Sequence, residues 1–173
     1  GFDVDDASQA VDLRPQDFVT KNGEGVEVGY MDYVLSIGLT GNVDAETYDV
    51  YGTVATPAYE LADGITAKFG AAGLITEANK AASGSIKVAY EMDDVSASVA
   101  SDVIYDGGLM ADVALAAAYD VYSLDVYFAT DANRGGYSNV ENLLSAQVKA
   151  ELDPLTVTVT GKDLINTQDL SAS

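Results

Sequence analysis

An alternation of apolar and polar positions repeats along most of this chain. Five alternating runs begin at positions spaced 30, 30, 29 and 31 residues apart: Leu35, Ile65, Val95, Leu124 and Leu155. The first run, residues 35–40, reads Leu-Ser-Ile-Gly-Leu-Thr, and the others follow the same scheme. Because side chains alternate between the two faces of a strand, each run predicts a β-strand with one apolar face. Regular recurrence of such a unit indicates an internally repeated β-structure.

A second alternating segment and a short turn precede each of these runs. The predicted turns are Met31-Asp32, Ala62-Asp63-Gly64, Asp93-Asp94, Tyr122-Ser123 and Asp153-Pro154. The connections at the other ends of the strands, 41–46, 76–84, 106–108 and 131–139, are rich in Gly, Asn, Asp and Ser. This pattern is typical of consecutive hairpins. We therefore predict an all-β, antiparallel, up-and-down arrangement of about ten strands over residues 26–165, after an acidic N-terminal arm or partial first strand (1–25) and before a tail (166–173).

Tyrosines form a second repeat. Tyr30, Tyr59, Tyr90 and Tyr119 precede predicted turns at spacings of 29, 31 and 29 residues. Alternation places them on the apolar face, at its turn end. Since tyrosine combines an apolar ring with a polar tip, such a row suits a boundary between hydrocarbon and water, and these four are our candidate membrane-interface aromatics. Tyrosines at the edge of a soluble sandwich would give the same pattern.

Charge is strongly negative and unevenly placed. The net charge is −20, from 28 acidic and 8 basic residues, which argues strongly against a nucleic-acid-binding surface. Most acids lie in turns and loops, whereas the charges within strands share the non-apolar face: Asp49, Lys68, Lys87, Asp112, Asp125 and Lys149. A charge on a lipid-facing position would cost roughly 2–4 kcal/mol near the bilayer midplane, so this placement favours an apolar face toward lipid. The six residues are our pore-lining candidates, and mutual pairing inside a filled interior is the structural alternative.

No catalytic constellation stands out in the sequence. With no Cys and no His, the chain lacks thiol nucleophiles, histidine bases and the commonest metal ligands. Gly161-Lys162 is followed by Asp163, so it does not form a phosphate-binding loop. We expect no enzymatic activity, no cofactor and no metal site. No apolar stretch approaches the roughly 20 residues of a membrane helix, whereas a membrane-spanning strand needs only about 9–11.

Two hairpin segments carry a family resemblance. Residues 90–97, Tyr-Glu-Met-Asp-Asp-Val-Ser-Ala, and 150–157, Ala-Glu-Leu-Asp-Pro-Leu-Thr-Val, resemble the periplasmic-turn hairpins of porin-like bacterial outer-membrane β-barrels. The resemblance covers about residues 26–165. It implies a transmembrane β-barrel exported to the outer membrane, its signal peptide removed or not included. It also implies the lipid bilayer as partner, assembly as a homo-oligomer, often a trimer, and a passive channel for small solutes, which the acidic lumen residues would bias toward cations.

The chain departs from that family in three ways. It ends Ser171-Ala172-Ser173 where such barrels usually end in an aromatic strand, ten strands are few, and no long loop stands out as a constriction. We therefore expect either part of a larger barrel or a small barrel with a largely filled interior.

Other interpretations remain open at the level of sequence. The first is a soluble or surface-layer β-sandwich with a structural or adhesive role. The second is a soluble barrel whose apolar face surrounds an apolar ligand. The direction in which the aliphatic row points distinguishes this inverted barrel from the membrane barrel.

Overall fold

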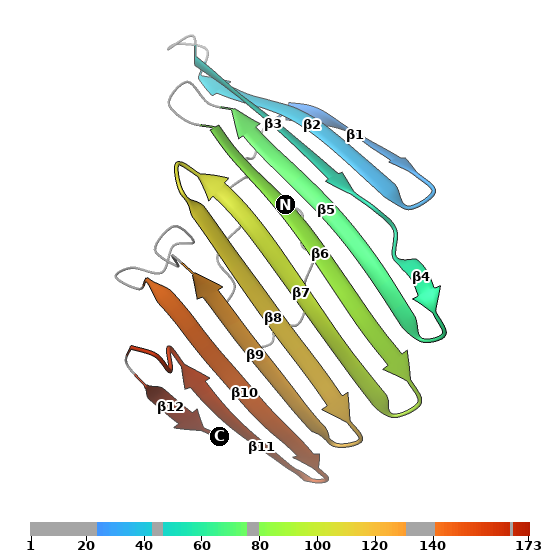
Figure 1. Ribbon diagram of the computed structural model, residues 1–173, viewed down its shortest axis with the longest axis vertical. Coiled ribbons are helices and arrows are strands. Elements are labelled where there is room, and N and C mark those ends of the chain that lie inside the picture. Colours follow the sequence, from blue (N-terminus) through green and yellow to red (C-terminus); the bar gives the residue numbers. More distant parts are fainter. Residues whose placement is uncertain (1–23, 43–46, 76–79, 131–140, 167) are drawn as a thin grey trace.

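The chain forms one antiparallel β-sheet (Figure 1). The computed structural model describes residues 24–42, 47–75, 80–130, 141–166 and 168–173. The strands are β1 (Glu24–Tyr30), β2 (Tyr33–Asn42), β3 (Thr47–Ala55), β4 (Tyr59–Ala62), β5 (Ile65–Ile75), β6 (Lys80–Met92), β7 (Val95–Asp106), β8 (Leu109–Tyr119), β9 (Tyr122–Thr130), β10 (Asn142–Leu152), β11 (Leu155–Lys162) and β12 (Asp169–Ala172). Within the described ranges no helix is long and apolar enough to cross a membrane.

The strands follow one another across the sheet in sequence order. The 12-stranded sheet runs β1-β2-β3-β5-β6-β7-β8-β9-β10-β11-β12, with β4 paired to β5 beside this path. All pairings are antiparallel, so the turns after β1, β4, β6, β8 and β10 gather at one end of the sheet and the connections after β2, β5, β7, β9 and β11, most of them longer, at the other. We call these the turn end and the loop end. The predicted all-β, up-and-down arrangement is confirmed.

Twelve strands replace the predicted ten for two local reasons. Tyr59–Ala62 form the separate strand β4, which pairs with β5 through an irregular register. Asp169–Ala172, within the predicted tail, pair with β11 as β12. Of the predicted N-terminal arm, residues 1–23 lie outside the described residues, and β1 begins at Glu24.

Turn chemistry explains the hairpins at the turn end. Met31 and Asp32 both have positive φ, 48° and 64°, as a two-residue turn of the hairpin-favouring kind requires. The prediction of a turn at Tyr122-Ser123 was wrong, because Tyr122 pairs with Tyr119 and already belongs to β9. The turn lies at Asp120-Val121, where Asp120 takes a φ of 52° that Asp tolerates better than most residues.

The two faces of the sheet differ in exposure. Large aliphatic and aromatic side chains on the face of Leu35 are exposed along the sheet: among them Ile37, Val54, Phe69, Ile86, Val99, Leu115, Leu124, Val148 and Val159. Most of the buried side chains belong to the opposite face: Ala72, Ala81, Ala100, Asp102, Ile104, Met110, Asp112, Ala114, Tyr127, Ala129, Leu143 and Ser145. We call these the aliphatic face and the inner face. The aliphatic row is therefore not the core of the described structure.

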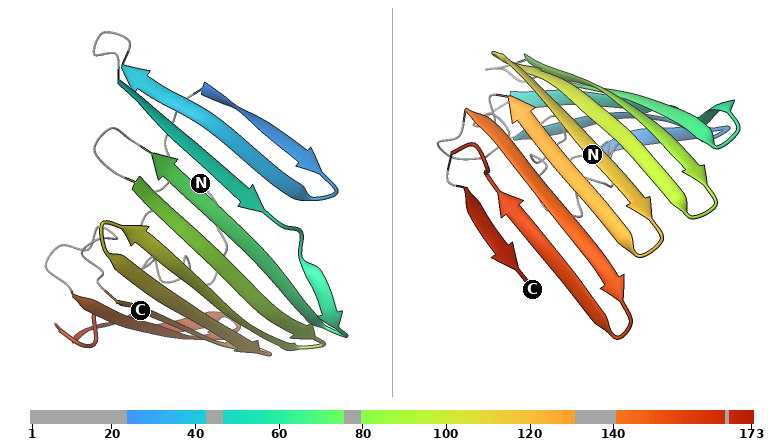
Figure 2. Two further views of the ribbon diagram at one scale, coloured as in Figure 1. Left: turned by 45° about the horizontal axis from the view of Figure 1, so that its top comes forward. Right: turned by 60° about the horizontal axis from the view of Figure 1, so that its bottom comes forward.

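The described sheet is open. Its order ends at β1 on one side and β12 on the other, and no pairing among the described strands joins them. The sheet is twisted and curled, and the two margins stand apart in each view (Figures 1 and 2). Closure into a barrel is thus not part of the described structure.

Candidate functional site

The polar groups of the inner face gather in the middle of β5 to β10. One cross-strand row joins Lys68, Lys87, Ala100, Ala114, Tyr127 and Ser145. The next row toward the loop end joins Gly70, Ser85, Asp102, Asp112, Ala129 and Leu143. These rows bring three predicted candidates, Lys68, Lys87 and Asp112, into one region.

Two buried aspartates face each other at its centre. Asp102 and Asp112 lie directly opposite across β7 and β8, and only 5 % and 4 % of their surfaces are exposed. The Asp102 amide donates to Asp112 Oδ1 at 3.0 Å, and the Tyr127 hydroxyl donates to Asp112 Oδ2 at 2.9 Å. Both carboxyl oxygens of Asp112 therefore accept a hydrogen bond, as burial of polar atoms demands.

Tyr127 and Ser145 close this cluster toward β10. Both are almost completely buried, at 1 % and 0 % exposure, and they lie opposite each other across β9 and β10. The Ser145 hydroxyl accepts a hydrogen bond from the Asp163 amide at 3.2 Å. A large ring and its hydrogen-bonded neighbours thus fill the inner face at mid-height, so that Tyr127 packs rather than lining open space.

Lys68 and Lys87 form a like-charged cross-strand pair. They lie directly opposite in the β5–β6 ladder and are half-buried. Like charges at such positions repel, so acids nearby are needed to balance them. Lys87 is the diagonal neighbour of Asp102, whose direct partner on β6 is Ser85, and a lysine side chain reaches that distance.

A hollow opens on the inner face at the turn end. Its volume is about 260 Å³, and small residues of β6 to β9, such as Ser96, Ser98 and Ala116, line it with Lys87, Glu91 and Asp125. Two acids and one base therefore border this space. The small side chains leave the inner face open here, in contrast to the packed region around Tyr127.

The remaining candidates are spread along the face. Asp125 lies opposite Gln147, whose amide donates to Thr160 Oγ1 at 2.9 Å. Lys149 forms an ion pair with Glu151 near the turn end, where both side chains are more than a third exposed. Asp49 pairs with Thr40 in the β2–β3 ladder, away from the central cluster, and its side chain lies outside the described part.

Three inner-face features were missed from sequence. Asp102 continues the alternation of Ser98 and Ala100 and could have been found by extending that run two residues further. Met110 and Leu143 are buried on the inner face near the loop end, at 0 % and 3 % exposure. Each is next to a leucine of the aliphatic face, and two adjacent apolar residues hide which of them points inward.

The tyrosine row lies at the turn end, as its spacing suggested. Tyr30 and Tyr119 end their strands and are 70 % and 63 % exposed, Tyr59 begins β4, and Tyr90 lies two residues before the end of β6. The Tyr90 hydroxyl contacts Met92 Sδ at 3.4 Å. All four positions share the aliphatic face.

Two more tyrosines extend this row. Tyr33 and Tyr122 pair with Tyr30 and Tyr119 across two-residue turns, so that both members of each pair share a face. The Tyr33 hydroxyl is hydrogen-bonded to that of Tyr59, and their rings meet edge to face at 6.3 Å. In the sequence, Tyr33 and Tyr122 each follow another tyrosine by three residues. That spacing fits two paired residues on either side of a two-residue turn, and it would have identified both tyrosines.

Comparisons with known proteins give no relative: no family model, curated protein or solved structure matches this chain. In the described segments no group of three or more His, Cys, Asp or Glu side chains could hold a metal ion.

Proposed function

We propose that this chain is an outer-membrane β-barrel protein that forms a passive, cation-biased channel for small solutes. One observation carries the proposal: large aliphatic side chains are exposed along one face, while the other face holds strand charges such as Lys68, Lys87 and Asp112 together with most of the buried side chains. A soluble protein rarely exposes so extended an apolar surface without a partner. In a bilayer, an apolar exterior and a polar interior are the expected arrangement.

Strand length supports a membrane-spanning role. β5, β8 and β10 each contain 11 residues, and β6 and β7 contain 13 and 12. Spanning strands are about 9–11 residues long when tilted by roughly 45°. The tyrosines at the turn end would lie where one bilayer surface meets water.

Cation bias follows from the hollow at the turn end. Of the charged side chains that border it, Glu91 and Asp125 are acidic and Lys87 is basic. An acidic entrance raises the local concentration of cations and lowers that of anions. Beyond this entrance, the side chains packed around Tyr127 would narrow the lumen of the proposed barrel. Passage would then be restricted to small solutes.

The proposed barrel requires the margins β1 and β12 to meet, within one chain or between copies in a homo-oligomer such as a trimer. The open sheet also favours a second candidate function. In a soluble or surface-layer β-sandwich module, a further sheet would cover the aliphatic face. The two candidates differ in where the aliphatic face goes, into lipid or against protein.

Reconstitution distinguishes them. A membrane barrel needs detergent or lipid to stay in solution, and its gel migration changes on heating.

In planar bilayers we expect discrete conductance steps. Under a KCl gradient, we expect a reversal potential that indicates a preference for K⁺ over Cl⁻. Asp125→Asn should reduce this preference, whereas Asp94→Asn in the β6–β7 turn should not. A chain that is monodisperse in plain buffer would support the sandwich, and folded protein without conductance would remove the channel function alone.

A further inference from the structure

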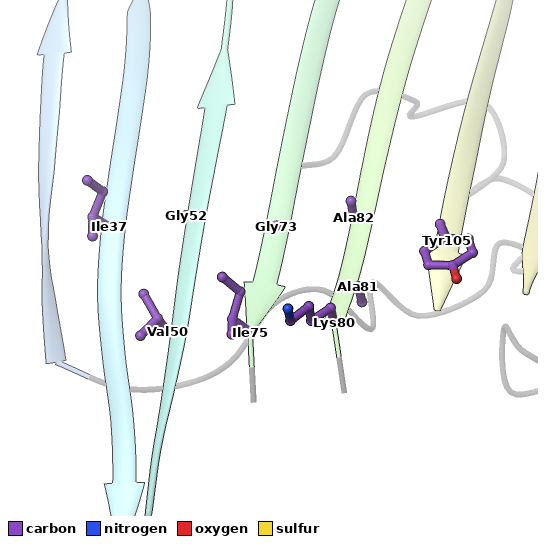
Figure 3. A pocket seen from close by; sticks show the side chains of 9 residues that line it. All are labelled: Ile37, Val50, Gly52, Gly73, Ile75, Lys80, Ala81, Ala82 and Tyr105. Atoms are coloured by element: carbon purple, nitrogen blue, oxygen red, sulfur yellow. The ribbon is translucent and has the colours of Figure 1, made fainter. Parts of the chain in front are cut away.

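The aliphatic face is interrupted by a groove near the loop end of β3, β5 and β6 (Figure 3). It has a volume of about 550 Å³ and is lined by Ile37, Val50, Gly52, Gly73, Ile75, Lys80, Ala81, Ala82 and Tyr105. That volume lies within the range of about 300–1,000 Å³ found for small-molecule sites. Eight of its nine lining residues lie on the aliphatic face, and Ala81 belongs to the inner face.

Register explains why the surface is hollow here. Ile37, Gly52, Gly73, Ala82 and Tyr105 form one continuous cross-strand row from β2 to β7. Larger side chains stand at both ends of this row, and the three central positions carry at most a methyl group. The row therefore forms a groove between the side chains of Ile37 and Tyr105, with a floor made by the three small central residues (Figure 3).

Gly73 is not required by the backbone. Its φ is not in the left-handed region, and a Cβ placed there would lie 4.0 Å from its nearest neighbour, the Ala81 carbonyl oxygen. Glycine within a strand lowers stability and often marks close approach by a ligand or another backbone. Neither the backbone conformation nor a close neighbour requires glycine at this position. The effect of the missing side chain is to leave the groove open.

The charge in the groove lies at its loop-end rim. Of the described residues that line it, Lys80 alone is charged, and it begins β6 opposite Ile75, the last residue of β5. Tyr105 lies at the same end of the sheet, on the penultimate residue of β7. An apolar trough with a lysine and a tyrosine at one end matches a lipid whose tail lies along the strands and whose headgroup stays at the surface.

We propose that this groove binds one acyl chain of an anionic, phosphate-bearing lipid, with the lipid phosphate at the Lys80 ammonium. The proposal rests on the membrane location proposed above. Lysine is a common phosphate-binding residue, and its three donors can serve a phosphate oxygen beside another acceptor. In a chain of net charge −20, one cation at the rim gives an anionic lipid a local preference for this position.

Native mass spectrometry tests the site directly. Protein folded into vesicles of equal phosphatidylglycerol and phosphatidylcholine is released into mild detergent, and the lipid retained per chain is counted. We expect one phosphatidylglycerol per chain, in excess over phosphatidylcholine. Ala82→Leu fills the floor and should lower retention of both lipids about tenfold, the effect of two methylene groups losing their burial. Ala117→Leu makes the same change on the aliphatic face of β8, outside the groove, and should leave retention unchanged.

A second pair of variants tests the contact between the lipid headgroup and Lys80. Lys80→Gln should abolish the preference for phosphatidylglycerol while lipid is still retained. Lys162→Gln, which removes the same charge at the end of β11, should not. Gly73→Ala, whose Cβ would lie 4.0 Å from its nearest neighbour, should fold normally and give a smaller loss than Ala82→Leu.

Three results would overturn the proposal: equal retention of both lipids by the parent protein, equal retention by the two Leu variants, or a change in subunit number instead of lipid count in Ala82→Leu. The last would make the groove a contact between copies. Heat-modifiable migration and protease protection in the same vesicles report membrane insertion separately. Inserted protein without bound lipid refutes only the groove, whereas protein that never inserts refutes the proposed function.

Discussion

Gly64 has a φ of +70° in the β4–β5 turn, and a Cβ there would lie 2.6 Å from the Glu91 carbonyl oxygen. The Glu91 amide in turn donates to the Gly64 carbonyl oxygen at 2.8 Å. A side chain at this position would therefore strain the turn and press on the neighbouring strand. Single residues such as this one fix where the sheet reverses direction.

We predict that Gly64→Ala lowers the free energy of unfolding by about 1–3 kcal/mol. Gly84→Ala is the control, because its Cβ would meet nothing within 4 Å. That variant should be neutral or more stable by roughly 0.5–1 kcal/mol. Urea unfolding of refolded protein, followed by circular dichroism, measures both, and equal values for the two variants would contradict the strain argument.

Tyr127 offers a second test at this scale. Its buried hydroxyl donates to Asp112 Oδ2, so Tyr127→Phe leaves a buried carboxylate oxygen without that donor. We expect a loss of about 1–3 kcal/mol in unfolding free energy, as for a buried acceptor left without its donor. Tyr105→Phe, at an exposed ring, should change it by less than about 0.5 kcal/mol. A neutral Tyr127→Phe would mean that this hydrogen bond contributes little.

Residue-level prediction from sequence succeeded where alternation was unambiguous. Lys68, Lys87 and Asp112 lie on the predicted face, because each is flanked by residues of the aliphatic face. Alternation could not reveal that Asp102 and Asp112 are directly opposite. That juxtaposition depends on the register between β7 and β8, which pairing and turn geometry set together.

Hairpins are the element that the sequence specifies best. The runs beginning at Ile65, Val95 and Leu155 start strands at those residues, because Asp, Gly and Pro mark the preceding turns. The turn before Leu124 was misplaced by two residues, since tyrosines can both end and begin a strand. β12 was not foreseen, because four residues are too few for alternation to stand out.

Arginine substitutions at two depths in the bilayer test whether the aliphatic face contacts hydrocarbon. Leu115, near the middle of β8, and Leu155, the first residue of β11, both expose their side chains on the aliphatic face. In a bilayer, Leu115→Arg should cost about 2–4 kcal/mol and Leu155→Arg about 0–1 kcal/mol. Unfolding from lipid vesicles measures the difference, and equal small costs would argue that this face does not contact hydrocarbon.

At the scale of the whole molecule, the two margins of the sheet decide whether a barrel can form. Closure depends on contacts between β1 and β12, which lie at opposite ends of the described order. Local patterns carry no information on such distant pairing: alternation predicted the strands, whereas closure into a barrel was implied by the family resemblance and is not part of the described structure.

Spin labels at the margins test closure. The chain has no Cys, so Val28→Cys with Leu170→Cys places labels only on β1 and β12. A closed barrel in vesicles should give the strong coupling of neighbouring strands, which lie about 4.8 Å apart. Dilution with unlabelled protein preserves this signal when closure is within one chain and removes it when copies close one another. Weak coupling at every dilution would show that the margins stay apart.

The strict alternation of the two faces has a consequence for how this chain can change length. Inserting one residue in the middle of β8 would send every later side chain of that strand to the wrong side, so that Leu115 and Ala117 would trade places with Ala114 and Ala116. Inserting a pair of residues would keep each side chain on its own side and merely lengthen the strand. Natural variants of this chain should therefore differ by even numbers of residues within strands, and by any number in the connecting loops.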